Sequence, residues 1–366
     1  MRDLPRTPDG FDQNLPLEKA STIPSDWYLD PRVEIVEREM VFGASWQAVG
    51  RASQVAERGQ FITADIAGEP IVVVRSDDGV LRGFYNVCRH RAARVVPESE
   101  GHATKLRCRY HGWTYDLAGK LRGVPEFDGV ANFCREDNSL PEIAVAAWGP
   151  VIWANLAPGA GPLLEFLSPL PEKCAELGLE KLCFVERRQY DLACNWKVYV
   201  DNYLDGGYHV NTVHPGLAGV IDYSRYRTEI AGMTSVQISP LESKNDEVGQ
   251  VRTGDCAYYW WIFPNFMMNI YEGVMDTNLV LPLGPGVCRV IFDFYFSDVD
   301  APGRREFIGR SIEIADQIQQ EDAGICEEVQ CGLASRSYKT GRFSVRREAG
   351  GHHFHCLLAR ALQSDR

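Results

Sequence analysis

Two pairs of metal-binding side chains lie close together in the first third of the chain. Cys88 and His90 are separated by one residue, Cys108 and His111 by two, and 17 residues lie between the pairs. Thiolates and imidazoles are the usual protein ligands of zinc and of iron–sulfur clusters. Four such donors in two close pairs are therefore interpreted as a metal centre rather than as unrelated core residues.

The mixture of residue types within each pair helps to distinguish the two kinds of centre. Zinc modules usually place two cysteines or two histidines in one short motif. In a Rieske [2Fe–2S] cluster, two thiolates bind one iron and two imidazoles bind the other, so each loop gives one ligand to each iron. The spacing therefore favours a Rieske cluster, with zinc as the alternative. His102, in the loop between the pairs, is interpreted as a solvated residue and not as a ligand.

A second concentration of metal-binding residues lies between residues 194 and 216. Asp205 and His209 are four positions apart, and a helix spanning roughly 195–210 would place them on one face. His214 follows five positions later, where a Pro-Gly pair is expected to end the helix. Two histidines and one carboxylate can form a facial triad that leaves positions on Fe(II) open for O₂ and substrate. In isolation such histidines are more often core residues, but a Rieske centre in the same chain favours ligation.

The first group of residues carries a resemblance to a known family. The segments NVCRHRA (86–92) and CRYHGWTYDLAGKL (108–121) resemble those of Rieske non-haem iron oxygenases. Arg109 stands where that family usually has proline, which should allow ligation while altering the charge nearby. The resemblance implies that four residues bind the cluster: Cys88, His90, Cys108 and His111.

The second group matches the same family in its spacing. The family pattern Asn-x-x-Asp/Glu-x-x-x-His-x₄-His is filled by Asn202, Asp205, His209 and His214. By resemblance, His209 and His214 bind a mononuclear iron, and Asn202 and Asp205 belong to the catalytic site. Asp205 is implied to be a bridging acid between His209 and the His111 of a neighbouring subunit, so that electrons cross between chains. A carboxylate that orients an imidazole and raises its basicity fits this role.

The third iron ligand is expected on a late helix. The stretch 304–333 has good helix propensity, and its later part, QQEDAGICEEVQ, carries four acidic residues, Glu321, Asp322, Glu327 and Glu328. On the residues alone, they could equally form an ordinary solvated face. The family takes its last ligand, usually an aspartate, from a helix of this kind. The resemblance therefore points to Asp322, with Glu321 as the nearest rival.

Three further histidines lie near the end of the chain, at His352, His353 and His355. On a helix, His352 and His355 would share a face, but no carboxylate motif accompanies them. They are interpreted as surface residues of a terminal packing helix rather than as ligands.

The stretch AYYWWIFPNFMMNIY (257–271) concentrates aromatic residues. Strand alternation sends about half of them to each face of a sheet, and one face could line a pocket over the iron. Such a pocket would bind a trimethylammonium group through cation–π attraction, although most of these residues are expected in the core. The predicted pocket residues are Tyr259, Trp261, Phe263, Phe266 and Tyr271.

Three stretches are similar to the choline monooxygenase branch of the family: DNYLDGGYHV (201–210), FPNFMMNIY (263–271) and MDTNLVLPLGP (275–285). This likeness implies a monooxygenase that hydroxylates or N-demethylates choline, a betaine or a carnitine-like compound. An aromatic pocket would also accept a flat ring, so an aromatic-ring-hydroxylating dioxygenase is an alternative. A Rieske ferredoxin-type electron carrier is another, although a carrier needs no second metal centre.

The resemblance also implies cofactors and partners. Electrons from NAD(P)H would arrive through a separate flavin or iron–sulfur reductase, because the sequence has no GxGxxG phosphate-binding motif. They would pass from the [2Fe–2S] cluster through His111, Asp205 and His209 to the mononuclear Fe(II). One atom of O₂ would enter a substrate C–H bond and the other would leave as water. Electron transfer between subunits makes a homotrimer the expectation.

Two kinds of local structure must position these residues. Short alternating runs such as FITADIA (61–67) and PIVVVRS (70–76) predict strands, and a PGAGP stretch after residue 157 marks a boundary. Further strands and a long helix follow it. The predicted fold class is α+β, with a large antiparallel sheet covered by helices in a helix-grip-like arrangement. The predicted parts are an N-terminal arm and helix packing on the catalytic domain (1–45), an all-β Rieske domain (46–157) and the catalytic domain (158–366).

The composition limits the remaining possibilities. A chain of 366 residues with 45% hydrophobic residues can bury the cores of two domains. The formal charge of −12 argues against nucleic acid or an anionic membrane as a partner, since both attract basic surfaces. Eleven cysteines, a polar N-terminus without a signal peptide and no run of 18 apolar residues predict a cytoplasmic protein with free thiols.

Overall fold

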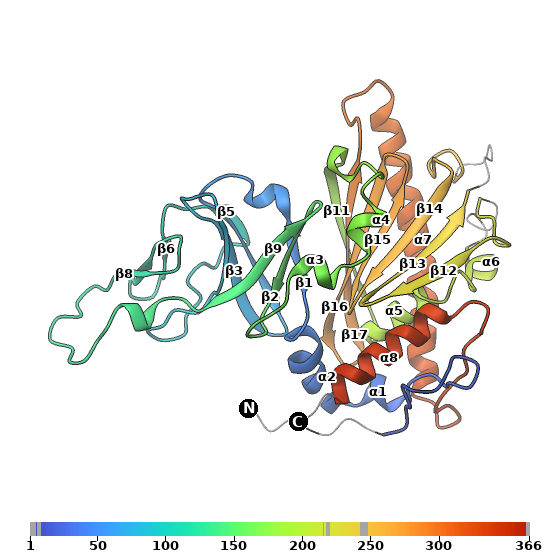
Figure 1. Cartoon of the computed structure of the whole chain (residues 1–366), viewed down its shortest axis with the longest axis horizontal. Coiled ribbons are helices and arrows are strands. Elements are labelled where there is room, and N and C mark those ends of the chain that lie inside the picture. Colours follow the sequence, from blue (N-terminus) through green and yellow to red (C-terminus); the bar gives the residue numbers. More distant parts are fainter. Residues whose placement is uncertain (1–4, 6–8, 215, 217–219, 242–247, 364–366) are drawn as a thin grey trace. The chain divides into compact units, whose positions relative to one another are not determined.

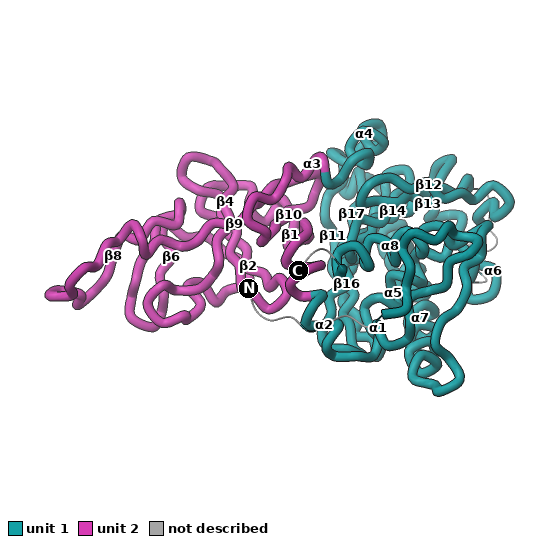
Figure 2. The backbone as a smooth tube through the Cα atoms, turned by 60° about the horizontal axis from the view of Figure 1, so that its bottom comes forward, with its two compact units in different colours: residues 1–37, 166–366 teal, residues 38–165 magenta. Residues whose placement is uncertain are grey.

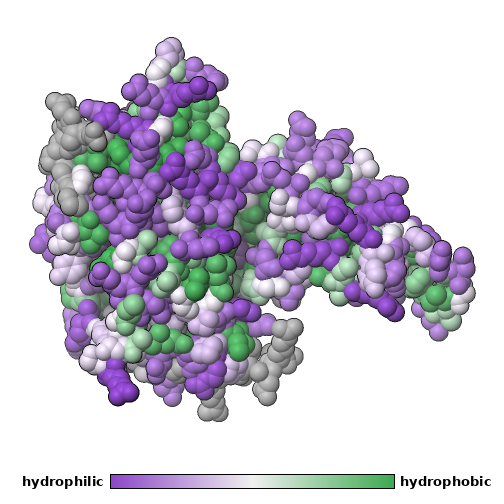
Figure 3. All heavy atoms as spheres, turned by 180° about the vertical axis from the view of Figure 1, so that it is seen from behind, coloured by the Kyte–Doolittle hydropathy of each residue, from purple (hydrophilic) through white to green (hydrophobic). Residues whose placement is uncertain are grey.

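The computed structural model describes residues 5, 9–214, 216, 220–241 and 248–363. The chain divides into two compact units, one of residues 38–165 and the other of residues 1–37 and 166–366 (Figure 2). The sequence analysis places its domain boundaries at residues 46 and 158, and that functional division stays a proposal. In the part of the chain that is described, no helix is long and apolar enough to cross a membrane. Hydrophilic and hydrophobic side chains are interspersed on the faces seen in Figure 3.

The unit of residues 38–165 contains two antiparallel sheets. The order of the larger sheet is β1 (Gln47–Arg51), β10 (Val151–Asn155), β9 (Glu142–Trp148), β4 (Leu81–Tyr85), β3 (Glu69–Arg75), β2 (Gln60–Ile66) and β5 (Glu100–His102). The order of the smaller sheet is β6 (Leu106–Arg107), β7 (Thr114–Tyr115) and β8 (Leu121–Gly123). Short helical turns cover Arg38–Phe42, Ala52–Val55 and Glu136–Asn138.

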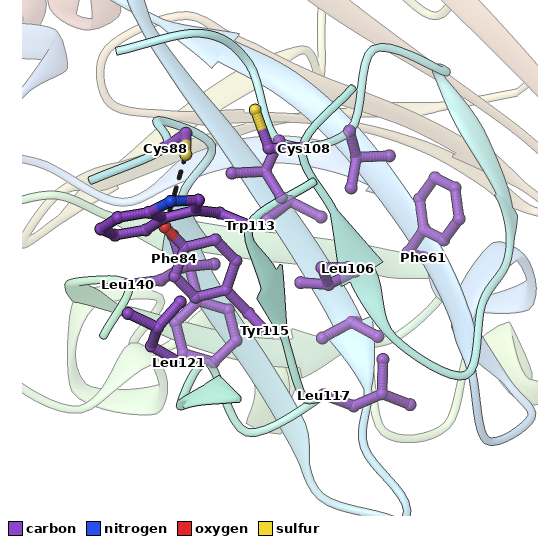
Figure 4. Close-up of a cluster of buried hydrophobic side chains, with 14 residues drawn as sticks. Phe61, Phe84, Cys88, Leu106, Cys108, Trp113, Tyr115, Leu117, Leu121 and Leu140 are labelled. Carbon is purple, nitrogen blue, oxygen red and sulfur yellow. Dashed lines mark hydrogen bonds between the residues drawn. The ribbon is translucent and has the colours of Figure 1, made fainter. Parts of the chain in front are cut away.

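Strand β3 is buried on both faces of the larger sheet. Residues 71–74 are all 0% exposed, which is why this part of the sequence is continuously apolar rather than alternating. Val72 and Val74 belong to an apolar cluster that also contains Cys88 and Cys108 (Figure 4). The loops that carry the predicted cluster ligands are therefore anchored in the core of this unit.

The second unit is built on one seven-stranded antiparallel sheet (Figure 1). Its order is β11 (Cys183–Leu192), β17 (Val287–Phe296), β16 (Val274–Gly284), β15 (Phe266–Tyr271), β14 (Cys256–Ile262), β13 (Thr234–Pro240) and β12 (Arg227–Ala231). Strands β12 to β17 follow one another as a meander, because each is joined to the next neighbour in the sheet, and β11 adds to the free edge of β17. The predicted α+β fold class is confirmed.

Three longer helices accompany this sheet. They are α5 (Trp196–Tyr203), α7 (Arg304–Leu333) and α8 (Ala349–Gln363), and α5 contacts the other two. The predicted helix at 304–333 coincides with α7. The shorter helices are α1 (Asp26–Leu29), α2 (Pro31–Glu37), α3 (Leu163–Phe166), α4 (Leu170–Lys173), α6 (Val210–Val213) and the turn Leu179–Lys181.

A buried ion pair ties α2 to α5. The Lys197 ammonium donates to Glu37 Oε1 at 2.6 Å, and both side chains are almost completely buried. The indole Nε1 of Trp196 donates to Glu37 Oε2 at 2.9 Å, so both carboxylate oxygens are occupied. Breaking one partner of such a pair leaves a buried charge, which is strongly destabilising. The start of α5, which leads to Asn202 and Asp205, is thereby fixed.

Candidate metal centres and pocket

The first candidate centre lies on two loops with the same backbone geometry. In each loop the residue four positions after the cysteine, Ala92 or Gly112, has a positive φ of 58° or 73°. Its amide donates to the carbonyl of the cysteine, from Ala92 to Cys88 at 2.9 Å and from Gly112 to Cys108 at 3.0 Å. These tight turns direct two histidines toward the same point: His90, two positions after Cys88, and His111, three positions after Cys108.

The four predicted ligands come together with the sulfurs inside and the imidazoles outside. Cys88 and Cys108 are 3% and 2% exposed and lie beside Trp113 (Figure 4). The Nδ1 atoms of His90 and His111 face each other at 3.1 Å, and His111 is exposed while His90 is partly exposed. The ring of His90 stacks on Trp113 with 5.0 Å between ring centroids and 7° between planes.

The protonation of these donors suits a metal cluster. Burial raises the pKa of Cys108, so a thiolate there requires a nearby cation to stabilise its charge. Burial also lowers the pKa of His90, with His111 and Arg91 acting in the same direction, which keeps the imidazole neutral. Two buried sulfurs and two facing nitrogens fit the donor set of a Rieske cluster.

The residues around this centre are close in sequence to its four donors. The Tyr115 hydroxyl accepts from the amide of Arg89 at 3.1 Å and lies 3.5 Å from the sulfur of Cys88. Arg109, at the position where proline is usual, pairs with Glu98, so its charge is balanced at the surface. His102 is exposed on the edge strand β5 rather than in a loop, and it does not join the four donors.

The second candidate centre begins where α5 ends. The predicted helix to residue 210 is wrong, because α5 stops at Tyr203 and Gly206 and Gly207 adopt positive φ angles of 71° and 70°. A side chain at Gly206 would collide with the carbonyl oxygen of Arg347. Asp205 and His209 are therefore brought together by a turn and not by helical periodicity.

Asp205 organises this turn and holds the His209 ring. Its Oδ1 accepts from the amide of Tyr208 at 3.1 Å, and its Oδ2 from the amide of His209 at 2.9 Å. The Nδ1 of His209 lies 2.5 Å from Oδ2. Because a carboxylate accepts, Nδ1 carries the proton and Nε2 is left with its lone pair. The orientation of the ring and its tautomer are thus set by one side chain.

Three ligand atoms converge at this centre. His209 Nε2 and His214 Nε2 are 3.1 Å apart, and His214 Nε2 is 3.1 Å from Asp322 Oδ1 on α7. His209 Nε2 is 3.6 Å from the same oxygen. All three atoms lie within 4.8 Å of one another, and Asn202 Nδ2 donates to Asp322 Oδ1 at 2.7 Å. Two imidazoles and one carboxylate are the donor set of a facial triad.

Glu321 occupies a different position from its neighbour Asp322. Its Oε2 lies 2.7 Å from Nδ1 of His214, on the side of the ring away from the converging atoms. Although burial opposes the imidazolium, Asp322 and Glu321 together raise the pKa of His214, and a metal cation could take the place of that proton. Glu327 accepts from the amide of Ala193 at 2.9 Å instead of facing this site.

The terminal histidines lie on a packing helix, α8, as predicted, but they are not all at its surface. The prediction of surface residues is wrong for His355, which is 1% exposed because α8 presses it against the N-terminal segment. Its Nδ1 accepts from the amide of Ile23 at 3.2 Å, and its Nε2 donates to Asp201 Oδ1 at 2.8 Å. His353 Nε2 lies 3.1 Å from the carbonyl oxygen of Gly232.

A cavity of about 110 Å³ opens over the three converging atoms. Of the predicted pocket residues, Tyr259 and Tyr271 line it. Most of the other residues that line it were not predicted, because no local motif marks them, and they include Tyr203, Tyr226, Arg252 and Asp276. The sequence offered one hint of these residues, which is that polar residues such as Asp276 interrupt the apolar strand β16.

Three predicted pocket residues lie elsewhere. Trp261 is covered by α8, where its ring contacts Phe354 at 5.5 Å between centroids. Phe266 pairs with Ile262 in the sheet and alternates to the face opposite Tyr259. Phe263 precedes a cis-proline at the β14–β15 turn and packs on Trp261. Strand alternation correctly placed Tyr259 and Tyr271 on the face of the cavity. It could not show that helix α8 covers Trp261 on the same face.

Comparisons with known families agree with this geometry. The Rieske [2Fe-2S] domain family matches residues 45–134, and the catalytic domain family of ring hydroxylating alpha subunits matches residues 179–364. The chloroplastic choline monooxygenase of Arabidopsis thaliana is 40% identical over 97% of this chain and 86% of its own. The carnitine monooxygenase oxygenase subunit of Escherichia coli (strain K12) is 30% identical over 94% of this chain and 95% of its own.

Solved structures show the same architecture. The quaternary ammonium Rieske monooxygenase CntA in complex with L-carnitine has a TM-score of 0.84 and 27% identity, covering 98% of this chain and 100% of that one. Naphthalene 1,2-dioxygenase from Rhodococcus sp. shares the fold at 21% identity and a TM-score of 0.78, covering 94% of this chain and 95% of its own. With both domains matched and relatives aligned over nearly its full length, the chain belongs to the Rieske non-haem iron oxygenases of the ring-hydroxylating alpha-subunit family.

Proposed function

We propose that the chain is the oxygenase component of a Rieske monooxygenase that acts on a small quaternary-ammonium compound, such as choline, a betaine or carnitine. The observation that carries this proposal is the cavity of about 110 Å³ lined by tyrosines directly over three converging ligand atoms. Tyrosine faces attract quaternary ammonium groups through cation–π interaction. The similarity to choline and carnitine monooxygenases supports the same substrate class.

The two donor sets support a specific assignment of the metals. Cys88, His90, Cys108 and His111 would hold the Rieske cluster, and His209, His214 and Asp322 would hold a mononuclear Fe(II). With both metals bound, O₂, two electrons and two protons convert a substrate C–H bond to C–OH and release one water. Hydroxylation of an N-methyl group gives a carbinolamine that releases formaldehyde, and hydroxylation of the alcohol carbon of choline gives a hydrated aldehyde.

The surrounding residues have roles of their own in this proposal. Asp205 keeps the proton on Nδ1 of His209, so that Nε2 points to the metal position. Glu321 does the same for His214, and Asn202 orients the carboxylate of Asp322. Such partners fix ring orientation and raise ligand basicity, and their loss usually weakens metal binding or activity about 10- to 100-fold.

Asp205 is also the proposed entry point for electrons. It lines the tyrosine-rich cavity and a second one of about 260 Å³, so it is approached from two sides. The second cavity would admit the exposed His111 of a neighbouring subunit, which requires a homo-oligomer, most simply a trimer. A related CntA structure is described as revealing inter-subunit electron transfer. The electrons themselves would come from NAD(P)H through a separate reductase.

The size and polarity of the cavity favour this function over aromatic-ring hydroxylation. Pockets for drug-sized ligands are commonly about 300–1,000 Å³, so a cavity of about 110 Å³ suits a compact substrate. Arg252 and Asp276 also line it, and a flat hydrocarbon would offer neither side chain a group of opposite charge. The second donor set argues against a Rieske electron carrier, which needs only the cluster.

Reductase-coupled O₂ uptake tests this proposal directly. The purified chain, loaded with iron, is supplied with a Rieske-oxygenase reductase and NADH, and offered choline, glycine betaine, carnitine, benzoate or naphthalene. We expect consumption of O₂ and release of an aldehyde in equal amounts with at least one quaternary-ammonium compound, and none with the His214→Ala variant. Oxidation of the aromatic compounds alone would show that the proposed substrate class is wrong.

A further inference from the structure

The tyrosine-rich cavity contains a buried cation that forms no ion pair with the residues the structure describes. Arg252 is 6% exposed and lines the cavity. Its guanidinium stacks on the ring of Tyr271, with 4.6 Å from Cζ to the ring centroid. Among the described residues, its Nε has no hydrogen-bond partner and the side chain forms no ion pair. Buried charges are normally paired, because leaving one unpaired costs several kcal/mol.

The backbone holds Arg252 in this position. The amide of Arg252 donates to the carbonyl of Val248 at 3.0 Å. The next residue, Thr253, accepts from the amide of Glu272 at 3.1 Å, and its hydroxyl donates to the Glu272 carbonyl at 3.0 Å. These bonds tie the segment to the turn between β15 and β16, beside Tyr271. The guanidinium is therefore a fixed feature of the cavity and not a surface group folded inward.

The cavity also contains a separate carboxylate. Asp276 is 3% exposed, and its Oδ2 accepts from Asn269 Nδ2 at 2.7 Å and from Asn278 Nδ2 at 3.2 Å. Asn269 is oriented in turn by the Tyr203 hydroxyl, which donates to its Oδ1 at 2.8 Å. Asp276 and Arg252 lie close enough for each charge to stabilise the other, but they do not form an ion pair at contact distance, so a ligand can lie between them.

The charge pattern distinguishes between candidate substrates. A simple cation such as choline would bring a second positive charge beside Arg252 and leave the guanidinium unpaired. An uncharged aromatic compound would pair with neither Arg252 nor Asp276. A molecule with both a quaternary ammonium group and a carboxylate satisfies both residues, with its methyl groups against Tyr203, Tyr226 and Tyr259.

Building on the proposed function, we infer that the substrate is a zwitterionic betaine whose carboxylate is bound by Arg252, while the quaternary ammonium group faces Asp276 and the tyrosines. Arg252 would thus be a specificity-determining residue that selects betaines against choline. Glycine betaine and choline are the matched probes, because they share a trimethylammonium group and a two-carbon skeleton. They differ in carrying a carboxylate or a hydroxymethyl group.

The test measures binding of both probes to the iron-loaded protein by titration calorimetry, with γ-butyrobetaine as a longer betaine. We expect the wild type to bind at least one betaine about 10-fold or more tightly than choline, as a charged hydrogen bond implies. Arg252→Gln should weaken betaine binding about 10- to 100-fold and leave choline binding unchanged or stronger. Arg252→Lys retains the charge and should restore part of the preference.

Controls separate a specific effect from a folding defect. Arg225→Gln makes the same chemical change at an exposed arginine that pairs with Asp222, and it should leave binding of both probes unchanged. Thermal unfolding and iron content verify that each variant is folded. Equal affinity of the wild type for choline and the betaines, or equal weakening of both by Arg252→Gln, would overturn this inference while the proposed function stands. Failure of every quaternary-ammonium probe to bind would overturn both.

Discussion

The two metal centres are constructed in opposite ways. The proposed Rieske ligands come from two neighbouring loops of one unit, where His111 is exposed and His90 is partly exposed. The mononuclear site joins the turn after α5 to the middle of α7, with His214 and Asp322 108 positions apart, and His214 is 2% exposed. An electron entry point must be reachable from outside, whereas a site that activates O₂ must be shielded from water. The difference in burial follows these two requirements.

The centres also present opposite nitrogens of their imidazoles. His90 and His111 face each other through Nδ1, without a carboxylate among their described hydrogen-bond partners. At the mononuclear site Nδ1 is bound to a carboxylate, Asp205 for His209 and Glu321 for His214, and Nε2 points inward. Substitution of Asp205 or Glu321 should therefore affect the second centre and leave the first unchanged, which makes the comparison testable.

Removal of the third ligand should have the largest effect. In Asp322→Ala, the two histidines cannot retain Fe(II), so iron should fall from about three to about two atoms per chain, and turnover should be lost. Metal analysis gives the iron content, and electron paramagnetic resonance of the reduced protein should show an unchanged Rieske cluster. The matched control is Glu328→Ala at an exposed position on the same helix. Full iron content in Asp322→Ala would disprove the assignment of this ligand.

Substitution of the proposed bridging acid, Asp205, should leave both metals bound but slow electron transfer between them. Asp205→Asn removes the charge that holds Nδ1–H of His209, and we expect turnover to fall about 100-fold, at the upper end of the range for such partners. Chemical reduction of the cluster should remain normal, while its reoxidation in the presence of O₂ and substrate should become slow. Asp191→Asn, in an exposed ion pair with Arg289, is the control. Undiminished turnover in Asp205→Asn would rule out the bridging role.

The first centre was easier to predict from sequence than the second, because its ligands are close together in the chain. The four proposed Rieske donors lie within one short segment, and each tight turn holds a cysteine and a histidine that are close in sequence. Their spacing alone is therefore enough to identify them. The turn at Asp205 was predicted as helix, since periodicity alone does not show that Gly206 and Gly207 take positive φ angles. Local patterns identify which residues can bind a metal there, but not the backbone that presents them.

Long-range packing explains the remaining differences. Adjacent helix residues are about 100° apart, so Asp322 and Glu321 could not be distinguished before the position of α7 was known. The structure brings Oδ1 of Asp322 to the inner nitrogens and Oε2 of Glu321 to the outer nitrogen of His214. Arg252 reaches the cavity from a segment without any motif, so the sequence offered no indication of it.

The carboxylate behind His214 should have a smaller effect than the ligand beside it. Glu321→Gln keeps the shape of the side chain but removes the charge that holds Nδ1–H, and we expect iron affinity to weaken about 10-fold. Competition with a chelator measures this affinity, and activity at saturating iron should be mostly retained. A loss of iron as complete as in Asp322→Ala would mean that the two residues have exchanged roles.

The smallest effect is expected at the Rieske centre, where a hydroxyl takes the place of a supporting carboxylate. Tyr115 lies with its oxygen 3.5 Å from the sulfur of Cys88, and such a bond stabilises the more negative, reduced cluster. Tyr115→Phe should lower the reduction potential by about 20–60 mV, the equivalent of one ordinary hydrogen bond, without changing iron content. Protein voltammetry measures this shift, and Tyr85→Phe, in the other apolar cluster of the same unit, should produce none. An unchanged potential in Tyr115→Phe would mean that the hydroxyl does not donate to the sulfur, and the polarity at this centre would then come from the loop amides alone.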